Sequence, residues 1–317
     1  MKSFSGHLSF ILGGLILIGL PFFFIGGPGY HASRSYIAAW DLGHIFFFSI
    51  VTSWVLLQFR DKLANISPSK LFLLLFMSVL AIGSLLEFLQ MFSGGRNPDP
   101  ADVLRNQLGC LVAFAACSGK GRYVLPVALQ WSLRGTVVVL LALSAWPLMR
   151  AVVDEQQALR QFPVLADFET PFERYRWDNL TKTSEEIVNV RHGAKAMRVQ
   201  LSTAKYSCIG LFHFPGNWQG FQTLHCSLFN PLATVLTIHC RIHDVHHKEH
   251  NSEFADRFNL PIKLQPGWND VVIDLQQVWH APKNRKMDAQ HIEGLGFFVV
   301  QLEQPMSIIV DNLHLAH

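Results

Sequence analysis

The stretch LFLLLFMSVLAIGSLL at residues 71–86 contains no charged side chain and no proline. With its apolar flanks it is long enough to cross a bilayer, which takes about 20 apolar residues in a helix. A second stretch, from Ser3 to Ser33, also lacks Asp, Glu, Lys and Arg. We therefore predict that the first half of the chain is a bundle of membrane-spanning helices.

The apolar runs predict five spans, near residues 8–26, 41–59, 70–92, 102–118 and 133–149. The fourth is polar in its first turn and the fifth run is interrupted by Arg134, so a count of four stays open. Residues 123–132 are expected to lie at the membrane interface. The first span is expected to be retained, because its apolar core is longer than the ~7–15 residues of a signal peptide.

Lysine and arginine are distributed unequally between the two sides of this bundle. With a cytoplasmic N-terminus, the outer loops hold only Arg34 and Arg96, whereas the inner segments hold Lys2, Arg60, Lys62, Lys70, Lys120, Arg122 and Arg134. Positive residues favour the cytoplasmic side. The pattern predicts a cytoplasmic N-terminus, with an extracytoplasmic C-terminal domain if there are five spans and a cytoplasmic one if there are four. We expect the inner membrane of a Gram-negative-type bacterium, so the five-span chain would have a periplasmic domain.

The pattern changes after about residue 163. Runs such as AMRVQLS (196–202) and NDVVIDL (269–275) alternate or cluster β-branched residues, and turn signals such as PGNWQG separate them. Many short strands at this spacing are typical of an antiparallel, jelly-roll-like β-sandwich. The predicted organisation is a helical membrane domain at 1–152, a polar linker at 153–163 and an all-β sandwich at 164–317.

Composition excludes some classes of function. The net charge of the 317-residue chain is only +3, and no basic stripe is present, so no nucleic-acid partner is expected. The five cysteines form no metal-binding pattern; one disulfide among Cys208, Cys226 and Cys240 stays open. The histidine-rich stretch at 239–250 is expected to be a solvated loop rather than a zinc site.

Polar side chains gather near the outer ends of three predicted spans. Residues three or four apart share a helix face, so each span presents one polar face at the same depth. Ionisable groups at such depth are costly and indicate a functional site. The predicted cluster comprises Asp41, His44, Glu87, Gln90, Arg96, Asp99, Asp102 and Asn106.

Two interpretations of this cluster stay open. In the first it is a pocket for a lipid head group or an envelope precursor, in which Arg96 binds a phosphate or carboxylate and His44 or Glu87 moves protons. In the second it is a structural network, in which Glu87 pairs with an arginine and Asp102 caps a helix. No nucleophile stands out from the sequence.

The same residues resemble a known family. The pattern D-x-x-H, E-x-x-Q and R-x-x-D-x-x-D-x-x-x-N-x-x-G, which ends at Gly109, is similar to the VanZ-like membrane family over roughly residues 38–118. The resemblance implies a small multi-span protein, and the founding member of the family is associated with resistance to the glycopeptide teicoplanin. It implies architecture more than mechanism.

The second half resembles carbohydrate-binding jelly-roll domains in segments such as FPGNWQGFQTL (214–224) and VDNLHL (310–315). Flat aromatic side chains can stack on sugar rings. The ligand-binding candidates are Trp218, Phe221 and Trp268, with Trp218 expected to be exposed in a turn. The resemblance also implies a structural calcium, for which Asp167, Glu169 and Asp311 are the candidate ligands.

These features support three hypotheses. The first is a membrane protein that binds an envelope glycan or a lipid-linked amphiphile at the outer face of the inner membrane. The second is a membrane enzyme that acts on a lipid head group by acid–base chemistry. The third is a scaffold whose sandwich binds a partner protein. Membrane lipids are the expected partners in all three.

Overall fold

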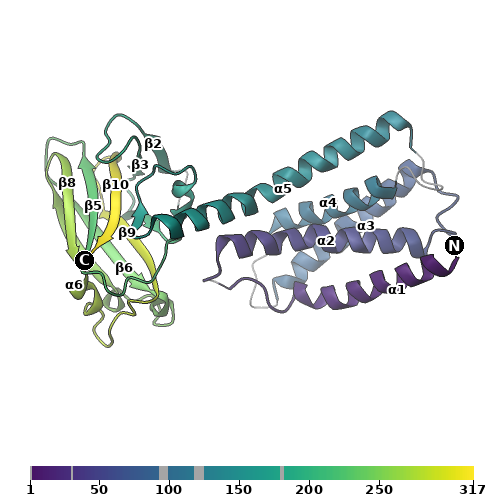
Figure 1. Cartoon of the computed structure of the whole chain (residues 1–317), viewed down its shortest axis with the longest axis horizontal. Helices are drawn as coiled ribbons and strands as arrows, with labels where there is room; N and C mark the ends of the chain where they lie inside the picture. Colours follow the sequence, from purple (N-terminus) through teal and green to yellow (C-terminus); the bar gives the residue numbers. More distant parts are fainter. Residues whose placement is uncertain (1, 30, 93–98, 118–124, 179–181) are drawn as a thin grey trace. The chain divides into compact units, whose positions relative to one another are not determined.

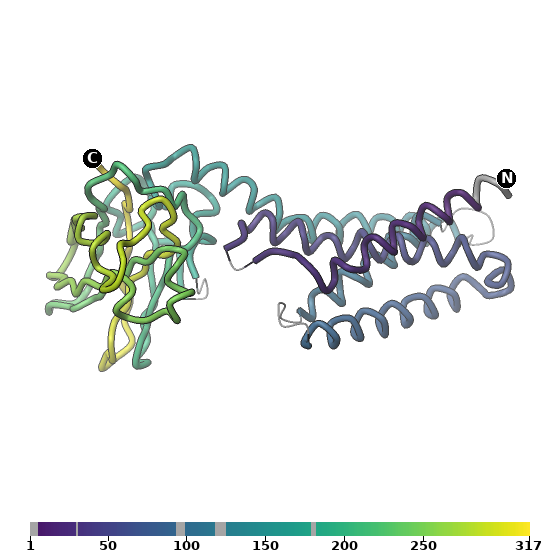
Figure 2. Tube along the Cα trace, turned by 90° about the horizontal axis from the view of Figure 1, so that it is seen from below, coloured from purple at the N-terminus to yellow at the C-terminus, as the bar shows by residue number. Residues whose placement is uncertain are grey.

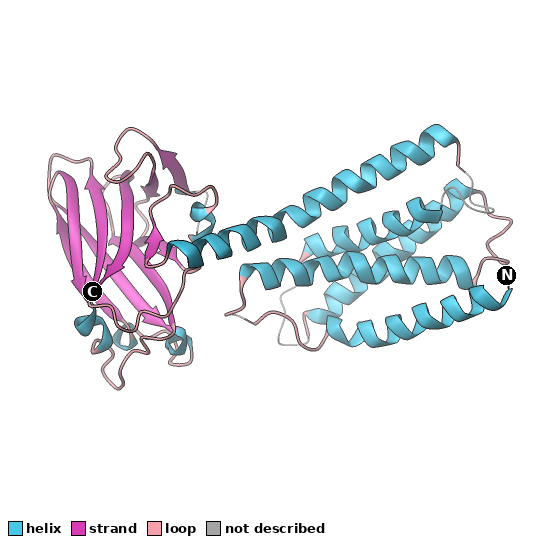
Figure 3. Cartoon of the chain, viewed as in Figure 1, coloured by secondary structure: helices cyan, strands magenta, loops and turns pink. Residues whose placement is uncertain are grey.

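The computed structural model describes residues 2–29, 31–92, 99–117, 125–178 and 182–317. The chain divides into two compact units, Met1–Ala151 and Val152–His317. Figure 3 shows that helices make up the first and strands most of the second. A helical half followed by an antiparallel β-sandwich, as predicted, is therefore confirmed.

Helices α1 to α4 lie alongside one another in the first unit, as Figures 1 and 2 show from two directions. Helix α4 packs against both α2 and α3, and α1 packs against α2. In chain order the elements are α1 (Lys2–Gly19), the 3-10 helix η1 (Leu20–Phe23), α2 (Arg34–Gln58), α3 (Pro68–Gln90), α4 (Pro100–Cys117) and α5 (Val127–Gln161).

Local capping sets where α2 and α3 begin. The Ser33 side chain accepts a hydrogen bond from the Tyr36 backbone N–H at 3.2 Å, which starts α2 at Arg34. Pro68 occupies the first turn of α3, where its missing N–H costs nothing. Asp41 and His44 therefore lie about two turns inside α2, and the prediction that they open this helix was wrong.

Four helices are long and apolar enough to cross a membrane: Gly6–Phe23, Arg34–Gln58, Pro68–Gln90 and Val127–Gln161. Helix α4, expected as a fifth span, is not among the candidates found in the described residues. Its first turns carry Asp102, Arg105, Asn106 and Gln107, which lower its mean hydropathy. Length and composition thus support several membrane-spanning helices without fixing their number at five.

Helix α5 differs from the prediction at both ends. It begins at Val127, so the described part of the stretch 123–132 is mostly helical, and it continues to Gln161 through the stretch expected to be a polar linker. Residues 153–161 contain no glycine or proline, and Glu, Gln, Ala, Leu and Arg favour helix. The helix ends at Gln161, two residues before Pro163.

Two antiparallel sheets form the sandwich (Figure 1). The first has the strand order β2-β3-β10-β5-β8, with β1 paired to β10, and the second has the order β4-β9-β6-β7. The strands are β1 (Val164–Ala166), β2 (Thr183–Glu186), β3 (Ala196–Leu201), β4 (Tyr206–Leu211), β5 (Thr223–Asn230), β6 (Leu236–Asp244), β7 (Phe258–Leu264), β8 (Gly267–Asp274), β9 (Ile292–Val300) and β10 (Met306–Ala316).

A continuous apolar core fills the space between the sheets, with Met197, Ile209, Trp218 and Phe297 among its fully buried side chains. The end of α5 belongs to the same unit. There the buried Arg176, from the 3-10 helix η2 (Glu173–Arg176), donates from Nε to both carboxylate oxygens of Asp154 at 3.1 Å.

Candidate functional site

A histidine on α2 and two polar side chains on α4 form the centre of the helical site. His44 Nε2 lies 3.3 Å from Asp102 Oδ2, and His44 Nδ1 lies 3.0 Å from Asn106 Oδ1. Asp102 and Asn106 are four residues apart on one face of α4, which lets both reach the same imidazole. His44 is 4% exposed and Asn106 is fully buried, so this contact is shielded from the surroundings of the bundle.

Arg105 connects the carboxylates around this centre. Its guanidinium lies 3.1 Å from Asp41 Oδ2 and 3.3 Å from Asp99 Oδ2, and it also pairs with Asp102 Oδ1. Arg105 was not among the site residues predicted from the sequence. It follows Asp102 by three residues and therefore lies next to it on α4. A planar guanidinium can bind several carboxylates at once, which holds α2 and the start of α4 together.

Glu87 and Gln90 bring the end of α3 to the same place. Glu87 Oε2 accepts the Asp99 backbone N–H at 2.9 Å, and Gln90 Nε2 donates to the Phe23 carbonyl of η1 at 2.8 Å. One ligand atom from each of His44, Glu87 and Asp102 lies within 4.8 Å of the other two. The structure thus brings together seven of the eight predicted residues; Arg96 lies outside the described residues.

Glycines allow the helices to approach closely around the site. A Cβ added at Gly109 of α4 would lie 2.6 Å from the Ile45 carbonyl oxygen of α2. One added at Gly83 of α3 would lie 2.8 Å from Asn106 Nδ2. A side chain at Gly109 would collide with the backbone of α2, so α4 approaches α2 this closely only because the residue is glycine; a side chain at Gly83 would displace the Asn106 amide.

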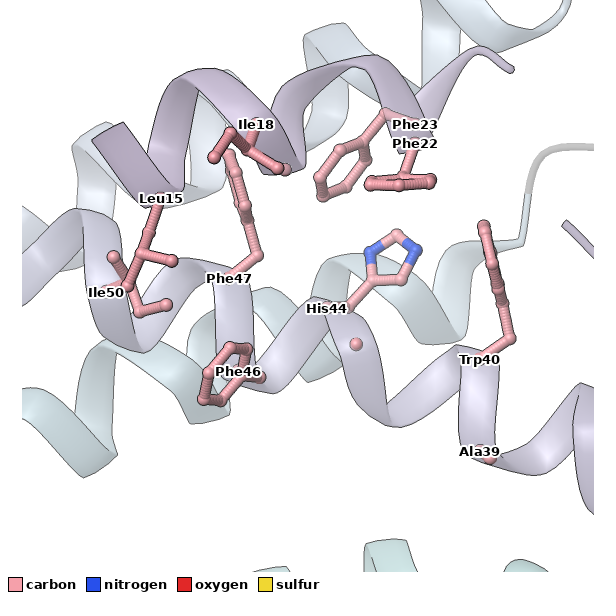
Figure 4. A pocket seen from close by; sticks show the side chains of 12 residues that line it. Leu15, Ile18, Phe22, Phe23, Ala39, Trp40, His44, Phe46, Phe47 and Ile50 are labelled. Carbon is pink, nitrogen blue, oxygen red and sulfur yellow. The ribbon is translucent and has the colours of Figure 1, made fainter. Parts of the chain in front are cut away.

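An apolar pocket of about 390 Å³ lies beside the polar cluster, between α1, η1 and α2. Figure 4 shows side chains of these elements around it, with the His44 imidazole among the aromatic rings. The Phe23 ring meets this imidazole edge-on, with centroids 4.9 Å apart. The walls also include Leu15, Phe22, Trp40, Phe46 and Phe47.

Among the described residues that line this pocket, His44 has the one ionisable side chain, and it also contacts Asp102 and Asn106. The imidazole is therefore shared between an apolar pocket and a polar cluster. Such an arrangement suits a molecule with one apolar and one polar part. The sequence did not predict the pocket, because the pocket depends on the contact between η1 and α2, in which Phe23 packs against His44.

The aromatic residues expected to bind a ligand on the sandwich have three different environments. Trp218 is fully buried: its backbone N–H donates to the Ala289 carbonyl at 2.8 Å, and its ring packs against Phe214. The prediction that it is exposed was wrong, because the turn points its ring into the core. Phe221 is partly buried and stacks on His317 with centroids 4.6 Å apart. Trp268 is partly exposed and packs against Phe229.

A polar groove of about 220 Å³ lies on the sheet that contains β5, β8 and β10. His225 and His314 stack along it, with centroids 4.9 Å apart and an interplanar angle of 12°. Arg191 pairs with Asp270 across it, and this hydrogen bond lowers the pKa of Asp270. Burial lowers the pKa of His314, so a neutral imidazole is favoured there.

Strand alternation explains why these groove residues lie together. Ser227 follows His225 by two residues, and its hydroxyl donates to Asp270 Oδ1 at 2.8 Å. Trp268 precedes Asp270 by two residues and therefore lies on the same face of β8. Sequence reasoning missed the groove because its residues come from strands far apart in the chain.

The three candidate calcium ligands do not form a set in the structure. Asp311 Oδ2 accepts the backbone N–H groups of Arg191 and His192 at 2.7 and 2.9 Å, and Glu169 Oε1 accepts those of Ala194 and Lys195. Among the described residues, the only three-residue group suited to a metal is His44, Glu87 and Asp102. Calcium at Asp167, Glu169 and Asp311 stays a prediction; in the structure the latter two carboxylates anchor the 191–195 loop.

The stretch 239–250 is not the solvated loop that was expected, because it begins in strand β6 and both His243 and His247 are buried. His247 and His250 both contact Asp256, which also pairs with Arg285. This Arg285 hydrogen bond lowers the pKa of Asp256 to about 2. Cys208, Cys226 and Cys240 are free thiols, so no disulfide joins them.

Comparison with known proteins adds a likeness for the C-terminal part alone. No family model matches the chain, and no curated protein matches it. The VanZ-like resemblance therefore rests on the motif residues themselves.

The C-terminal part resembles β-sandwich modules in solved structures. The family 11 carbohydrate-binding module of Clostridium thermocellum, in complex with a β-1,3-1,4-mixed-linked tetrasaccharide, is 16% identical; the match covers 48% of this chain and 94% of that one, with a TM-score of 0.37. A non-crystalline-cellulose-specific module of family 28 is 11% identical, covers 49% and 93%, and has a TM-score of 0.35. Because these TM-scores lie below 0.5, they carry no argument about the ligand.

Proposed function

We propose that this chain is an integral membrane protein that binds an amphiphilic molecule of the cell envelope. The apolar part of the ligand occupies the pocket between α1, η1 and α2, and its polar group reaches the cluster around His44 and Arg105. The observation that carries this proposal is the position of His44, which lines an apolar pocket of about 390 Å³ and contacts Asp102 and Asn106.

Physical arguments support this assignment. The pocket volume falls within the ~300–1,000 Å³ that is usual for small-molecule sites, which are mostly apolar with a few convergent polar groups. The helices around it expose large apolar side chains such as Phe10, Leu17 and Phe46, as expected in lipid. A lipid-linked precursor or another membrane lipid has the two-part chemistry that the pocket and the cluster require.

The orientation in the membrane forms part of the proposal. The Lys and Arg distribution favours a cytoplasmic N-terminus. A crossing of α4 would then place the sandwich in the periplasm, and its absence would place it in the cytoplasm. A reporter that is active only in the periplasm, fused after His317, tests this; an inactive fusion, with an active fusion after an outer loop as control, would contradict five spans.

The experiment for ligand binding fills the pocket without disturbing the fold. A Cβ added at Gly43, which lines the pocket, meets no atom within 4 Å, so Gly43→Leu extends into open space. Gly135→Leu on α5 is the matched control, because a Cβ there also meets nothing within 4 Å and Gly135 is outside the pocket lining. Binding is measured as copurified lipid by mass spectrometry and as displacement of a fluorescent lipid by a total envelope-lipid extract.

We expect Gly43→Leu to lose the copurified amphiphile and Gly135→Leu to retain it. Both variants should melt at or above the wild-type temperature, because leucine favours helix by up to about 1 kcal/mol over glycine. Equal ligand retention in wild type and Gly43→Leu would contradict the proposal.

A second candidate function, glycan binding by the sandwich, is favoured by the polar groove beside Trp268. The stacked pair His225 and His314, with Ser227, Asp270 and Asn312, offers hydrogen-bonding groups suited to sugar hydroxyls. A glycan array probed with the full chain in detergent tests this. His314→Ala should weaken binding and His239→Ala should not, because His239 also stacks on an aromatic ring, Phe298, but lies on the other sheet. No signal on the array for wild type would contradict this second function.

A further inference from the structure

We propose that His44, Glu87 and Asp102 form a binding site for a divalent transition-metal ion, for which Zn²⁺ is the best match. The three residues come from α2, α3 and α4, and none of the hypotheses based on sequence assigned a metal to them. The proposal rests on the geometry of these side chains and does not depend on amphiphile binding.

The spacing of the three side chains suits coordination. Zinc lies about 2.0–2.2 Å from nitrogen and oxygen ligands, and neighbouring ligands of a tetrahedral ion are therefore about 3.4 Å apart. His44 Nε2 and Asp102 Oδ2 are already 3.3 Å apart. The ligand atom of Glu87 lies within 4.8 Å of both, a gap that rotation of its flexible side chain can close.

The second ring nitrogen of His44 is held as it is in metal-binding histidines. In the tautomer that carries its proton on Nδ1, His44 donates to the Asn106 side-chain oxygen Oδ1, which lies 3.0 Å away. Nε2 then presents a lone pair to the carboxylate oxygen of Asp102. Two such atoms at 3.3 Å are stabilised by a proton on Nε2 or by a metal ion between them, and the spacing suits either. A hydrogen bond to the outer nitrogen of a ligating histidine is the usual second-shell arrangement.

The charges around the site also favour a cation. Three carboxylates of the described cluster, those of Asp41, Asp99 and Asp102, pair with Arg105, and Glu87 accepts the Asp99 backbone N–H. Glu87 is 7% exposed and His44 is 4% exposed, so water screens this negative charge poorly. A bound divalent ion would add positive charge beside His44, Glu87 and Asp102.

The donor set narrows the identity of the ion. One imidazole nitrogen and two carboxylate oxygens suit Zn²⁺ or Mn²⁺, whereas Ca²⁺ and Mg²⁺ prefer sites made of oxygen alone. Three protein ligands are the number found in zinc sites that keep a fourth position for water or a ligand. Because His44 also lines the apolar pocket, a head-group oxygen of a bound molecule could occupy that fourth position.

The test uses the full chain in detergent with its purification tag removed. Protein is stripped with a chelator, incubated with Zn²⁺, Mn²⁺ or Mg²⁺, desalted and analysed for metal by mass spectrometry. Glu87→Gln and His44→Gln remove ligands. Asp61→Asn and His239→Gln are matched controls, because Asp61 is 85% exposed and His239 lies in the sandwich. Zinc that binds the sandwich histidines is common to wild type and the ligand variants and cancels in the comparison.

We expect wild type and both controls to retain one more Zn²⁺ per chain than Glu87→Gln and His44→Gln. Asn106→Leu should weaken binding by about 10–100-fold, as loss of a second-shell partner does. If the ligand variants fold poorly, the melting temperature of wild type gives a second measurement: Zn²⁺ should raise it and Mg²⁺ should not.

Equal zinc content in wild type and Glu87→Gln, or no thermal shift of wild type with Zn²⁺ or Mn²⁺, would overturn the proposal and leave a proton between His44 and Asp102. The Gly43→Leu variant separates the two proposals. It should lose the amphiphile and keep the metal. If one of the two proposals, amphiphile binding or metal binding, is contradicted, the other can still be tested.

Discussion

The helical unit and the sandwich differ in what they expose. Large apolar side chains cover the outside of the helices, where Phe10 is 84% exposed and Leu17 is 73% exposed, and polar His44 and Asn106 are buried. In the sandwich the large side chain of Trp218 is fully buried between the sheets. An aqueous surface does not sustain so many exposed apolar side chains, so the two units are suited to different solvents.

The two units also pack by different means. The sandwich fills a core between two sheets with large side chains, so its stability depends on volume. The helices approach one another at Gly83 and Gly109, so their packing depends on residues that have no side chain. Removing a large side chain should therefore destabilise the sandwich, whereas adding a side chain at a glycine should destabilise the helices. The following predictions test this contrast.

The largest effect is expected at the buried ion pair of the sandwich unit. In a fragment of residues 152–317, Asp154→Leu removes the closest carboxylate partner of the fully buried Arg176 and leaves only Glu173, 4.0 Å away. Loss of one partner of a buried pair costs about 3–5 kcal/mol, whereas the double variant Asp154→Leu, Arg176→Met should be nearly neutral. Urea melts of the three proteins measure this. A small loss for the single variant would indicate that 152–161 is a linker after all.

Trp218→Ala should destabilise the same fragment by about 3–5 kcal/mol, because it opens a large cavity in the core. Trp268→Ala is the matched control on the partly exposed sheet face and should cost clearly less. The comparison is made by urea melts, with glycan binding measured alongside. Lost binding at unchanged stability for Trp218→Ala would restore this residue as a ligand platform.

Added volume should be harmful in the helices. Gly109→Ala places a Cβ 2.6 Å from the Ile45 carbonyl oxygen, and overpacking of this kind costs about 1–3 kcal/mol. Gly135→Ala, where a Cβ meets nothing within 4 Å, should stabilise slightly. Thermal melts of the full chain in detergent measure both. Equal melting temperatures would mean that α2 and α4 can separate freely.

Local patterns of the sequence predicted the two architectures well. Apolar runs and strand alternation are local, and residues three or four apart share a helix face, so the grouping of His44, Asp102 and Asn106 followed from spacing. The pattern did not reveal which way a turn points its aromatic ring, so Trp218 was misplaced. It also missed Arg105 as the centre of the carboxylates and the groove that joins His225 to His314, which depend on contacts in three dimensions.

The pH dependence of the sandwich offers a smaller effect. Burial lowers the pKa of His243 to about 3, so the folded state binds this proton less readily than the unfolded chain, whose pKa is 6.5. Stability is then lost as pH falls below 6.5, by about 2 kcal/mol near pH 5 at 1.36 kcal/mol per pKa unit.

The variant His243→Phe should remove most of this loss in the 152–317 fragment. Some slope should remain, because burial also lowers the pKa of His314. His239→Phe on the same strand is the control and should keep the wild-type slope. Urea melts between pH 5 and pH 7 provide the comparison, and identical slopes for wild type and His243→Phe would show that His243 does not carry the effect.

The smallest effect is expected where α1 meets α2. The Ser9 hydroxyl donates to Gln58 Oε1 at 2.6 Å, and Ser9 is 8% exposed. If lipid greatly strengthened such bonds, Ser9→Ala would be among the most harmful changes in the chain. Hydrogen bonds between membrane helices average only about 0.6 kcal/mol, because the separated helices find other partners. We therefore expect Ser9→Ala to cost about that much, and a double-mutant cycle with Gln58→Leu isolates the pair. A coupling energy several times larger would mean that the α1–α2 contact depends on this bond rather than on apolar packing.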